Sequence, residues 1–219
     1  LERVAPPLAR AYLAGQRPAD ALALLDSVPT VSTVASLSTL RGTSLLALNR
    51  AAEARQAFET AVGIDPKSVD ALLGLASAVA VDDVAAALTT TDRALALPPE
   101  APPVRLTRGA LQMRADRFAE AEVEFRIAAD LARKQSNRAH LVAALAGVTE
   151  SLLARDNAGG ALEVTAQLLT LAPQSQVVRY LRARALFQGG KPGEARPLLE
   201  QNLNANAQDT NSRLLLGAV

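Results

Sequence analysis

Small and apolar residues recur along the chain at the spacing of a helix face, and polar turns separate them. In the stretch RAAEARQAFETAVGIDP, residues 50–66, Ala54 and Phe58 lie four positions apart and Pro66 follows. Residues i and i+4 share one face of an α-helix, and Pro ends a helix because it has no backbone N–H and its ring blocks the preceding turn. The pattern therefore predicts a helix that packs through Ala54 and Phe58 and stops at Pro66.

The same arrangement returns along the whole chain with a period near 34 residues. An Ala follows each polar or Gly-containing turn, and successive Ala residues are 33, 33, 34, 40 and 34 positions apart. A larger residue stands four positions later in several units, as in Ala21 with Leu25 and Ala121 with Phe125. Such a period predicts helix–turn–helix units that bury their faces against their neighbours. The recurring Ala residues are Ala21, Ala54, Ala87, Ala121, Ala161 and Ala195.

A second small residue returns in the first helix of most units, 11 or 12 positions before the recurring Ala. Gly inside a helix costs about 1 kcal/mol relative to Ala, so its return in phase indicates close contact between helices. These small residues are Ala9, Gly42, Ala76, Gly109 and Ala183, and Gly217 continues the series.

At these residues the chain resembles the tetratricopeptide repeat family, whose pattern is W-x2-L-G-x2-Y, then A-x3-F, then P. Gly42 with Leu45 represents the first part and Ala54 with Phe58 the second, while the Trp position never holds Trp. The resemblance implies an all-α fold, a right-handed α-solenoid of about six hairpins plus a partial one. We expect one array over residues 1–219, itself part of a longer chain, with hairpins at approximately 2–34, 35–68, 69–101, 102–138, 139–174, 175–208 and, in part, 209–219.

One unit departs from the period, because six extra residues lie between Ala121 and Ala161. No Pro ends the second helix there, so we expect the helix that begins near Phe118 to run one to two turns longer. Two interpretations stay open: the extra residues contact a partner, or the array accommodates them through a local change in pitch.

Composition and charge exclude several functional classes. The chain has 23 basic and 22 acidic residues, which provides no global field to attract nucleic acid or an anionic membrane. It has no Cys, so neither a disulfide framework nor a cysteine zinc site is expected. No apolar run approaches the length of a membrane span.

Catalytic chemistry is not indicated either. His140 is the only His and cannot form a metal cluster with other His or Cys residues, and the Gly-containing turns lack the features of a phosphate-binding loop. Arg is frequent from Arg105 to Arg138, but carboxylates accompany it, which favours surface ion pairs over a basic ligand patch. We therefore expect no enzyme activity, no cofactor and no metal.

The first helices of a repeat array line its concave surface, where partners bind. We expect the groove to be formed by the residues that follow the small positions and by their neighbours one turn away. Lys is nearly absent, so a groove that clamps a C-terminal carboxylate through several Lys and Asn residues is disfavoured. The predicted groove residues are Arg10, Thr43, Ser77, Met113, Glu150, Tyr180, Arg184 and Phe187.

These features predict a non-catalytic scaffold that binds a protein or peptide in its groove. The segment 171–219 is similar to the arrays of bacterial periplasmic tetratricopeptide lipoproteins linked to exopolysaccharide export and exosortase-type sorting. This resemblance implies a periplasmic protein, tethered to a membrane by a lipid upstream of residue 1, that assists cell-surface assembly. The alternatives are a regulatory or substrate-recruiting module of a larger enzyme, and a cytoplasmic assembly chaperone.

Overall fold

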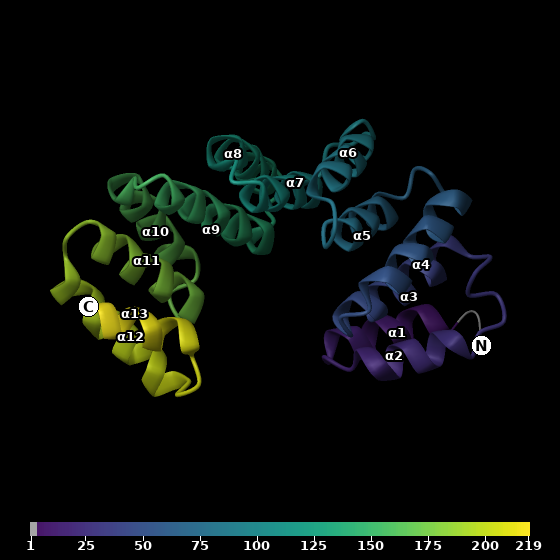
Figure 1. Cartoon of the computed structure of the whole chain (residues 1–219), viewed down its shortest axis with the longest axis horizontal. Coiled ribbons are helices and arrows are strands. Elements are labelled where there is room, and N and C mark those ends of the chain that lie inside the picture. The colour runs from purple at the N-terminus through teal and green to yellow at the C-terminus, as the bar shows by residue number, and fades with distance from the viewer. Residues whose placement is uncertain (1–3) are drawn as a thin grey trace. The chain divides into compact units, whose positions relative to one another are not determined.

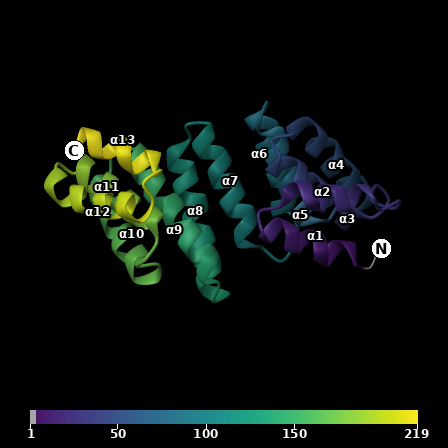
Figure 2. The same ribbon diagram turned by 90° about the horizontal axis from the view of Figure 1, so that it is seen from below.

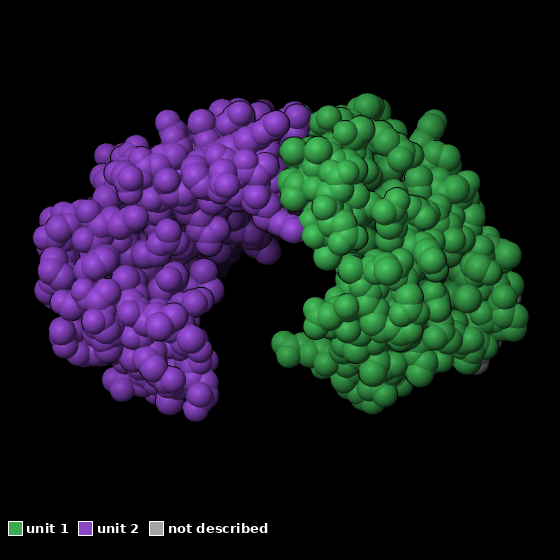
Figure 3. Space-filling view, in the orientation of Figure 1, with its two compact units in different colours: residues 1–100 green, residues 101–219 purple. Residues whose placement is uncertain are grey.

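The computed structural model describes residues 4–219, and all of its regular structure in that range is helical. Thirteen α-helices follow one another there and form six antiparallel hairpins and one further helix (Figure 1). The predicted all-α class and number of hairpins are confirmed. The helices gather into two compact parts, which are unit 1, residues 1–100, and unit 2, residues 101–219 (Figure 3).

Unit 1 consists of three hairpins. Its first helices are neighbours in turn, because α3 contacts both α1 and α5, while α2 also packs on α3 and α4 also packs on α5. The hairpins are α1 (Ala5–Ala14) with α2 (Pro18–Asp26), α3 (Ala35–Ala47) with α4 (Ala51–Ile64), and α5 (Val69–Val79) with α6 (Val84–Leu95).

Unit 2 repeats this plan with three hairpins and a single last helix. Its helices α7, α8 and α9 lie side by side (Figure 2). The bounds are α7 (Pro102–Arg114) with α8 (Phe118–Lys134), α9 (Arg138–Ala154) with α10 (Ala158–Leu171), α11 (Gln176–Gln188) with α12 (Pro192–Ala205), and α13 (Thr210–Ala218).

A common turn joins the two helices of most hairpins. In the α3–α4 turn, Asn49 has a φ of 58°, and the Arg50 backbone N–H donates to the Leu45 carbonyl at 2.9 Å. A residue in the left-handed region lets the chain reverse while the last carbonyls of the first helix keep a donor. The equivalent left-handed residues in the other hairpins are Gln16, Asp116, Asp156 and Gly190.

The same turn accounts for the irregular unit. Ser136 has a φ of 53° and joins α8 to α9, where other units use a longer connection between hairpins. Helices α8 and α9 are both 17 residues long, compared with 14 for α4 and 13 for α3. The helix that begins at Phe118 is longer, as expected, and the following helix, for which no change was predicted, is lengthened as well.

The recurring Ala residues are fully buried between the helices. All six are 0% exposed, and the larger residues four positions later, such as Phe58 and Leu199, are buried with them. An Ala side chain brings two helix axes close together, and the larger neighbour fills the space beside the contact. The packing role predicted for these residues is confirmed.

Two Phe rings are each held between two glycines of flanking first helices. A Cβ at Gly42 of α3 would lie 2.8 Å from Phe58 Cζ, and one at Gly74 of α5 would lie 2.1 Å from Phe58 Cε1. In unit 2, Phe125 fills the corresponding space beside Gly109 of α7 and Gly147 of α9. Each ring therefore locks its own hairpin to the next one.

Candidate binding site

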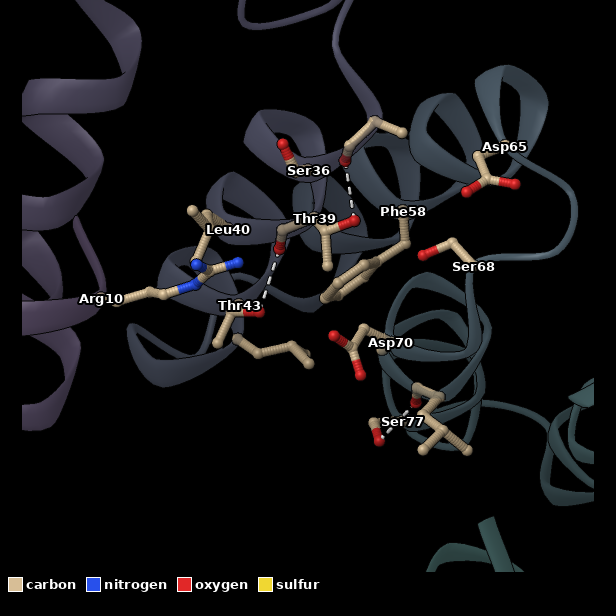
Figure 4. Close-up of a pocket in the computed structure, with 14 residues that line it drawn as sticks. Arg10, Ser36, Thr39, Leu40, Thr43, Phe58, Asp65, Ser68, Asp70 and Ser77 are labelled. Atoms are coloured by element: carbon tan, nitrogen blue, oxygen red, sulfur yellow. Dashed lines mark hydrogen bonds between the residues drawn. The ribbon is translucent and has the colours of Figure 1, made fainter. Parts of the chain in front are cut away.

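A pocket in unit 1 gathers predicted groove residues from three successive first helices. Arg10 of α1, Thr43 of α3 and Ser77 of α5 all line it, and its volume is about 480 Å³. Figure 4 shows Arg10 on one side of the pocket, Thr39 and Thr43 next to it, and Asp70 and Ser77 on the side of α5. The positions derived from repeat phase thus converge in space within this unit.

The pocket lining combines hydroxyl groups with an apolar floor. Thr43 Oγ1 donates to the Thr39 carbonyl at 2.9 Å, and Ser77 Oγ donates to the Leu73 carbonyl at 2.9 Å. Because the hydroxyl hydrogens are used within each helix, the oxygens face the pocket as acceptors. Leu46 and Leu73, both partly buried, also line the pocket, so apolar surface lies beside these acceptors.

Two opposite charges border the pocket from different helices. Arg10 comes from α1 and Asp70 from the first turn of α5, and both side chains are exposed. Within residues 4–219 neither side chain has an ion-pair or hydrogen-bond partner. No ion pair with residues 4–219 neutralises these two charges, so they can meet charges on a ligand.

In unit 2 the predicted residues separate into two groups. Glu150 of α9 and Tyr180 of α11 line a second pocket of about 300 Å³, together with Gln176 and Asp209. Glu150 is exposed as a whole residue, but burial of its carboxyl group still raises its pKa. The neighbouring Arg184 guanidinium opposes this shift because it favours the charged carboxylate.

Met113 and Phe187 occupy a different environment. Met113 packs against the core of unit 2, and its sulfur accepts a hydrogen bond from the Ser151 hydroxyl at 3.2 Å. Phe187 packs against the cluster of Ala183, Leu186 and Leu199. Both side chains are partly buried in these contacts, and their assignment to the groove, which was made from helix phase, stays a prediction.

The Arg-rich region forms ion pairs around two carboxylates of α8. Glu124, with a side chain only 9% exposed, lies 2.8 Å from Arg105 and 3.6 Å from Arg108 of α7. Glu122 pairs with Arg126 and with Arg155 across to the end of α9. The structure thus favours the interpretation that these arginines serve internal pairing. Within the described part of the chain, no group of His, Cys, Asp and Glu side chains could hold a metal ion.

Sequence reasoning missed several residues of the unit 1 pocket. Asp70, Thr39 and Ser36 lie one or two helical turns from Ser77 and Thr43, on the same helix faces. The i, i+4 and i+7 spacing from the predicted positions was the signal that could have found them.

Models of the tetratricopeptide repeat match the sequence at residues 7–27, 39–102 and 152–219. No curated protein matches the chain. Among solved structures, PilW, a widely conserved type IV pilus biogenesis factor, has a TM-score of 0.79 at 18% identity, over 98% of this chain and 97% of its own.

Two further structures share this architecture. A tetratricopeptide repeat protein from Parabacteroides merdae has a TM-score of 0.72 at 19% identity, over 98% of this chain and 83% of its own. PilF from Pseudomonas aeruginosa has a TM-score of 0.71 at 20% identity, over 83% of this chain and 80% of its own. At these identities the likeness concerns the fold.

The chain is therefore a tetratricopeptide repeat protein, and its fold is an all-α solenoid of the PilW type. The family consists of non-catalytic scaffolds for interactions with proteins and peptides, and this chain is such a scaffold. Among residues 4–219, none of the helices combines the length and the apolar character that a bilayer span requires.

Proposed function

We propose that unit 1 binds an extended segment of a partner protein in the pocket between α1, α3 and α5. One observation carries the proposal: Arg10, Thr43 and Ser77, from three different helices, open on one pocket. An extended peptide has unpaired backbone N–H groups, and the hydroxyl oxygens of Thr43 and Ser77 are free to accept from them. Helical or folded partners offer fewer such donors because their own structure uses them.

A selection from a random peptide display library tests this proposal on the whole 219-residue chain. Thr43→Trp fills the pocket, whereas Thr89→Trp is a matched control, because Thr89 is an exposed Thr of α6 that also donates to the carbonyl four residues earlier. We expect selected peptides to bind wild type and Thr89→Trp and to lose binding to Thr43→Trp. Equal binding to both variants, or no enrichment of peptides, would contradict the proposal.

The biological setting proposed for this scaffold is cell-surface assembly in bacteria. Two observations support it: the likeness of segment 171–219 to periplasmic lipoproteins linked to exopolysaccharide export, and the shared fold with the pilus biogenesis factor PilW. In this proposal the protein resides in the periplasm, tethered to a membrane through a segment upstream of residue 1. The scaffold then holds an unfolded or extended segment of a secretion component during assembly.

Cell fractionation of the full-length parent protein, with metabolic labelling by a fatty-acid analogue, tests the setting separately from the binding site. The proposed setting predicts that the protein carries the label and is found in the membrane fraction. It also predicts that removal of the lipid releases the protein together with the periplasmic contents. An unlabelled protein found only in the cytoplasm would contradict the proposed setting and favour an assembly chaperone there.

A further inference from the structure

The unit 1 pocket carries opposite charges on opposite walls. These charges belong to Arg10 and Asp70, which have no ion-pair partner among residues 4–219. Arg10 enters from α1, and Asp70 enters from α5, with α3 between the two helices (Figure 4). Asp65, at the end of α4, also lines the pocket, and its carboxylate accepts a hydrogen bond from the Lys67 backbone N–H at 3.0 Å. One end of the pocket is therefore basic and the other end acidic.

The middle of the pocket differs from both ends. Thr39 and Thr43 of α3 present hydroxyl oxygens there, with their hydrogens donated to carbonyls of α3. Leu46 of α3 and Leu73 of α5, both partly buried, also line the pocket there, while the Phe58 ring beneath them is only 1% exposed. A ligand that crosses the pocket thus meets hydrogen-bond acceptors and a small apolar surface between the two charges.

Helix spacing sets the distance over which these groups are distributed. Packed helices lie about 8–10 Å apart, so α1 and α5 are separated by about 16–20 Å across α3. An extended chain advances about 3.3 Å per residue, so about five or six residues span that distance. The two charges of a complementary ligand are accordingly about four to six residues apart.

We infer that the pocket selects an extended peptide segment with an acidic group at the α1 end, a basic side chain at the α5 end and an apolar side chain between them. This inference rests on the proposed function and adds the charge order of the ligand. The unpaired Arg10 and Asp70 determine that order, and reversal of either charge reverses the preference at that end alone.

The same display library tests the charge order when it is selected on Arg10→Glu and Asp70→Lys variants of the whole chain. On wild type we expect enriched peptides to carry an acidic and a basic residue about four to six positions apart. On Arg10→Glu the acidic residue is replaced by a basic one, and on Asp70→Lys the basic residue is replaced by an acidic one. Control variants reverse exposed charges outside the pocket, Arg93→Glu and Asp82→Lys, and retain the wild-type preference.

A binding titration with one wild-type-selected peptide gives the quantitative readout. Arg10→Glu weakens its binding about tenfold or more, and exchange of the acidic residue of the peptide for Lys restores it. Asp70→Asn, which keeps the shape of the side chain, loses the preference for a basic residue even if Asp70→Lys disturbs the first turn of α5. Thermal unfolding followed by circular dichroism checks that each variant is folded.

The outcomes separate this inference from the proposed function. Peptides that lose binding to Thr43→Trp but show no charge order, or keep it after both reversals, overturn the inference and leave the groove proposal standing. A selection that enriches no peptide on wild type overturns both.

Discussion

The contact between Phe58 and Gly74 allows a sharp test of how the hairpins of unit 1 are joined. Gly74→Ala adds a Cβ that would lie 2.1, 2.4 and 2.6 Å from three atoms of the Phe58 ring. The ring has little room to move aside, because on its other side it lies so close to Gly42 of α3 that a Cβ added there would be 2.8–2.9 Å from ring atoms. Overpacking of a core costs about 1–3 kcal/mol, and we expect the upper part of this range because the ring is confined on both sides.

The helix propensity of Ala favours the substitution, whereas the contact with the ring opposes it. The sign of the measured change in stability therefore shows which of the two effects is larger. Ala is about 1 kcal/mol more favourable than Gly inside a helix, so the net effect of Gly74→Ala is a loss of about 2 kcal/mol in unfolding free energy. In a Phe58→Ala background the ring is absent, and the same substitution then stabilises the protein by up to about 1 kcal/mol. The sign of the effect therefore depends on the ring alone.

Urea unfolding of the four proteins of this double-mutant cycle, followed by far-ultraviolet circular dichroism, measures the coupling. Gly63→Ala is the matched control, because a Cβ at this helical glycine of α4 meets no atom within 4 Å. We expect the control to stabilise unit 1 slightly in either background. If Gly74→Ala stabilises the wild-type protein as the control does, the packing described for Phe58 is wrong.

Three further predictions concern unit 2. Ala121→Leu, at a position that is 0% exposed, lowers the unfolding free energy by about 1–3 kcal/mol, and an unchanged melting temperature would contradict the assigned helix contact. Glu124→Gln removes the carboxylate shared by Arg105 and Arg108 and lowers the unfolding free energy, measured with urea, by about 2 kcal/mol. This cost is smaller than for a fully buried ion pair because the arginines are partly exposed. An unchanged unfolding free energy would show that these ion pairs do not contribute to stability. Burial raises the pKa of Glu150 above its ordinary 4.5, so the folded state binds its proton more readily than the unfolded state, and this contribution to stability falls as pH rises from 4.5 through the raised pKa. Glu150→Gln removes this pH dependence and raises the melting temperature at pH 7 relative to wild type. If the melting temperature of the variant depends on pH as it does in wild type, Glu150 is not the source of the pH dependence.

The repeat fold could be predicted because the residues that recur with its period all serve helix packing. A buried Ala that recurs at 33 or 34 positions, apart from one interval of 40, with a large apolar residue one turn later in several units, fits helix contacts and little else. Gly74 and Gly147 were missed because the phase was counted from the Ala and not from the Phe. Gly42 and Gly74 each lie 16 residues from Phe58, which shows that the ring was the better reference point.

The irregular unit shows where local sequence was insufficient. Ser136 adopts a left-handed conformation with a φ of 53°, although Gly or Asn is the usual residue for such a turn. The sequence around Ser136 therefore gave no clear end for α8, and the lengthening of α9 was not predicted. The start of α9 is marked locally by Asn137, whose side-chain oxygen accepts a hydrogen bond from the His140 backbone N–H at 3.1 Å.

Helix phase was enough to predict some residues of the candidate site but not all of them. Phase placed Arg10, Thr43 and Ser77 on one surface, and they line one pocket. Phase also selected Met113, which is partly buried against the core of unit 2, where the Ser151 hydroxyl contacts its sulfur. The order of charges across the pocket needed Asp70, whose position depends on how α5 packs on α3.

The most direct test of the central claim maps where a selected peptide binds on the protein. Titration of the isotope-labelled whole chain with that peptide, followed by amide and methyl NMR shifts, reports the contact surface residue by residue. We predict that the largest shifts fall on Thr39, Thr43 and Ser77 and on the residues beside Phe58. Shifts confined to the outer helices α2, α4 and α6, with none in the pocket, would contradict the account.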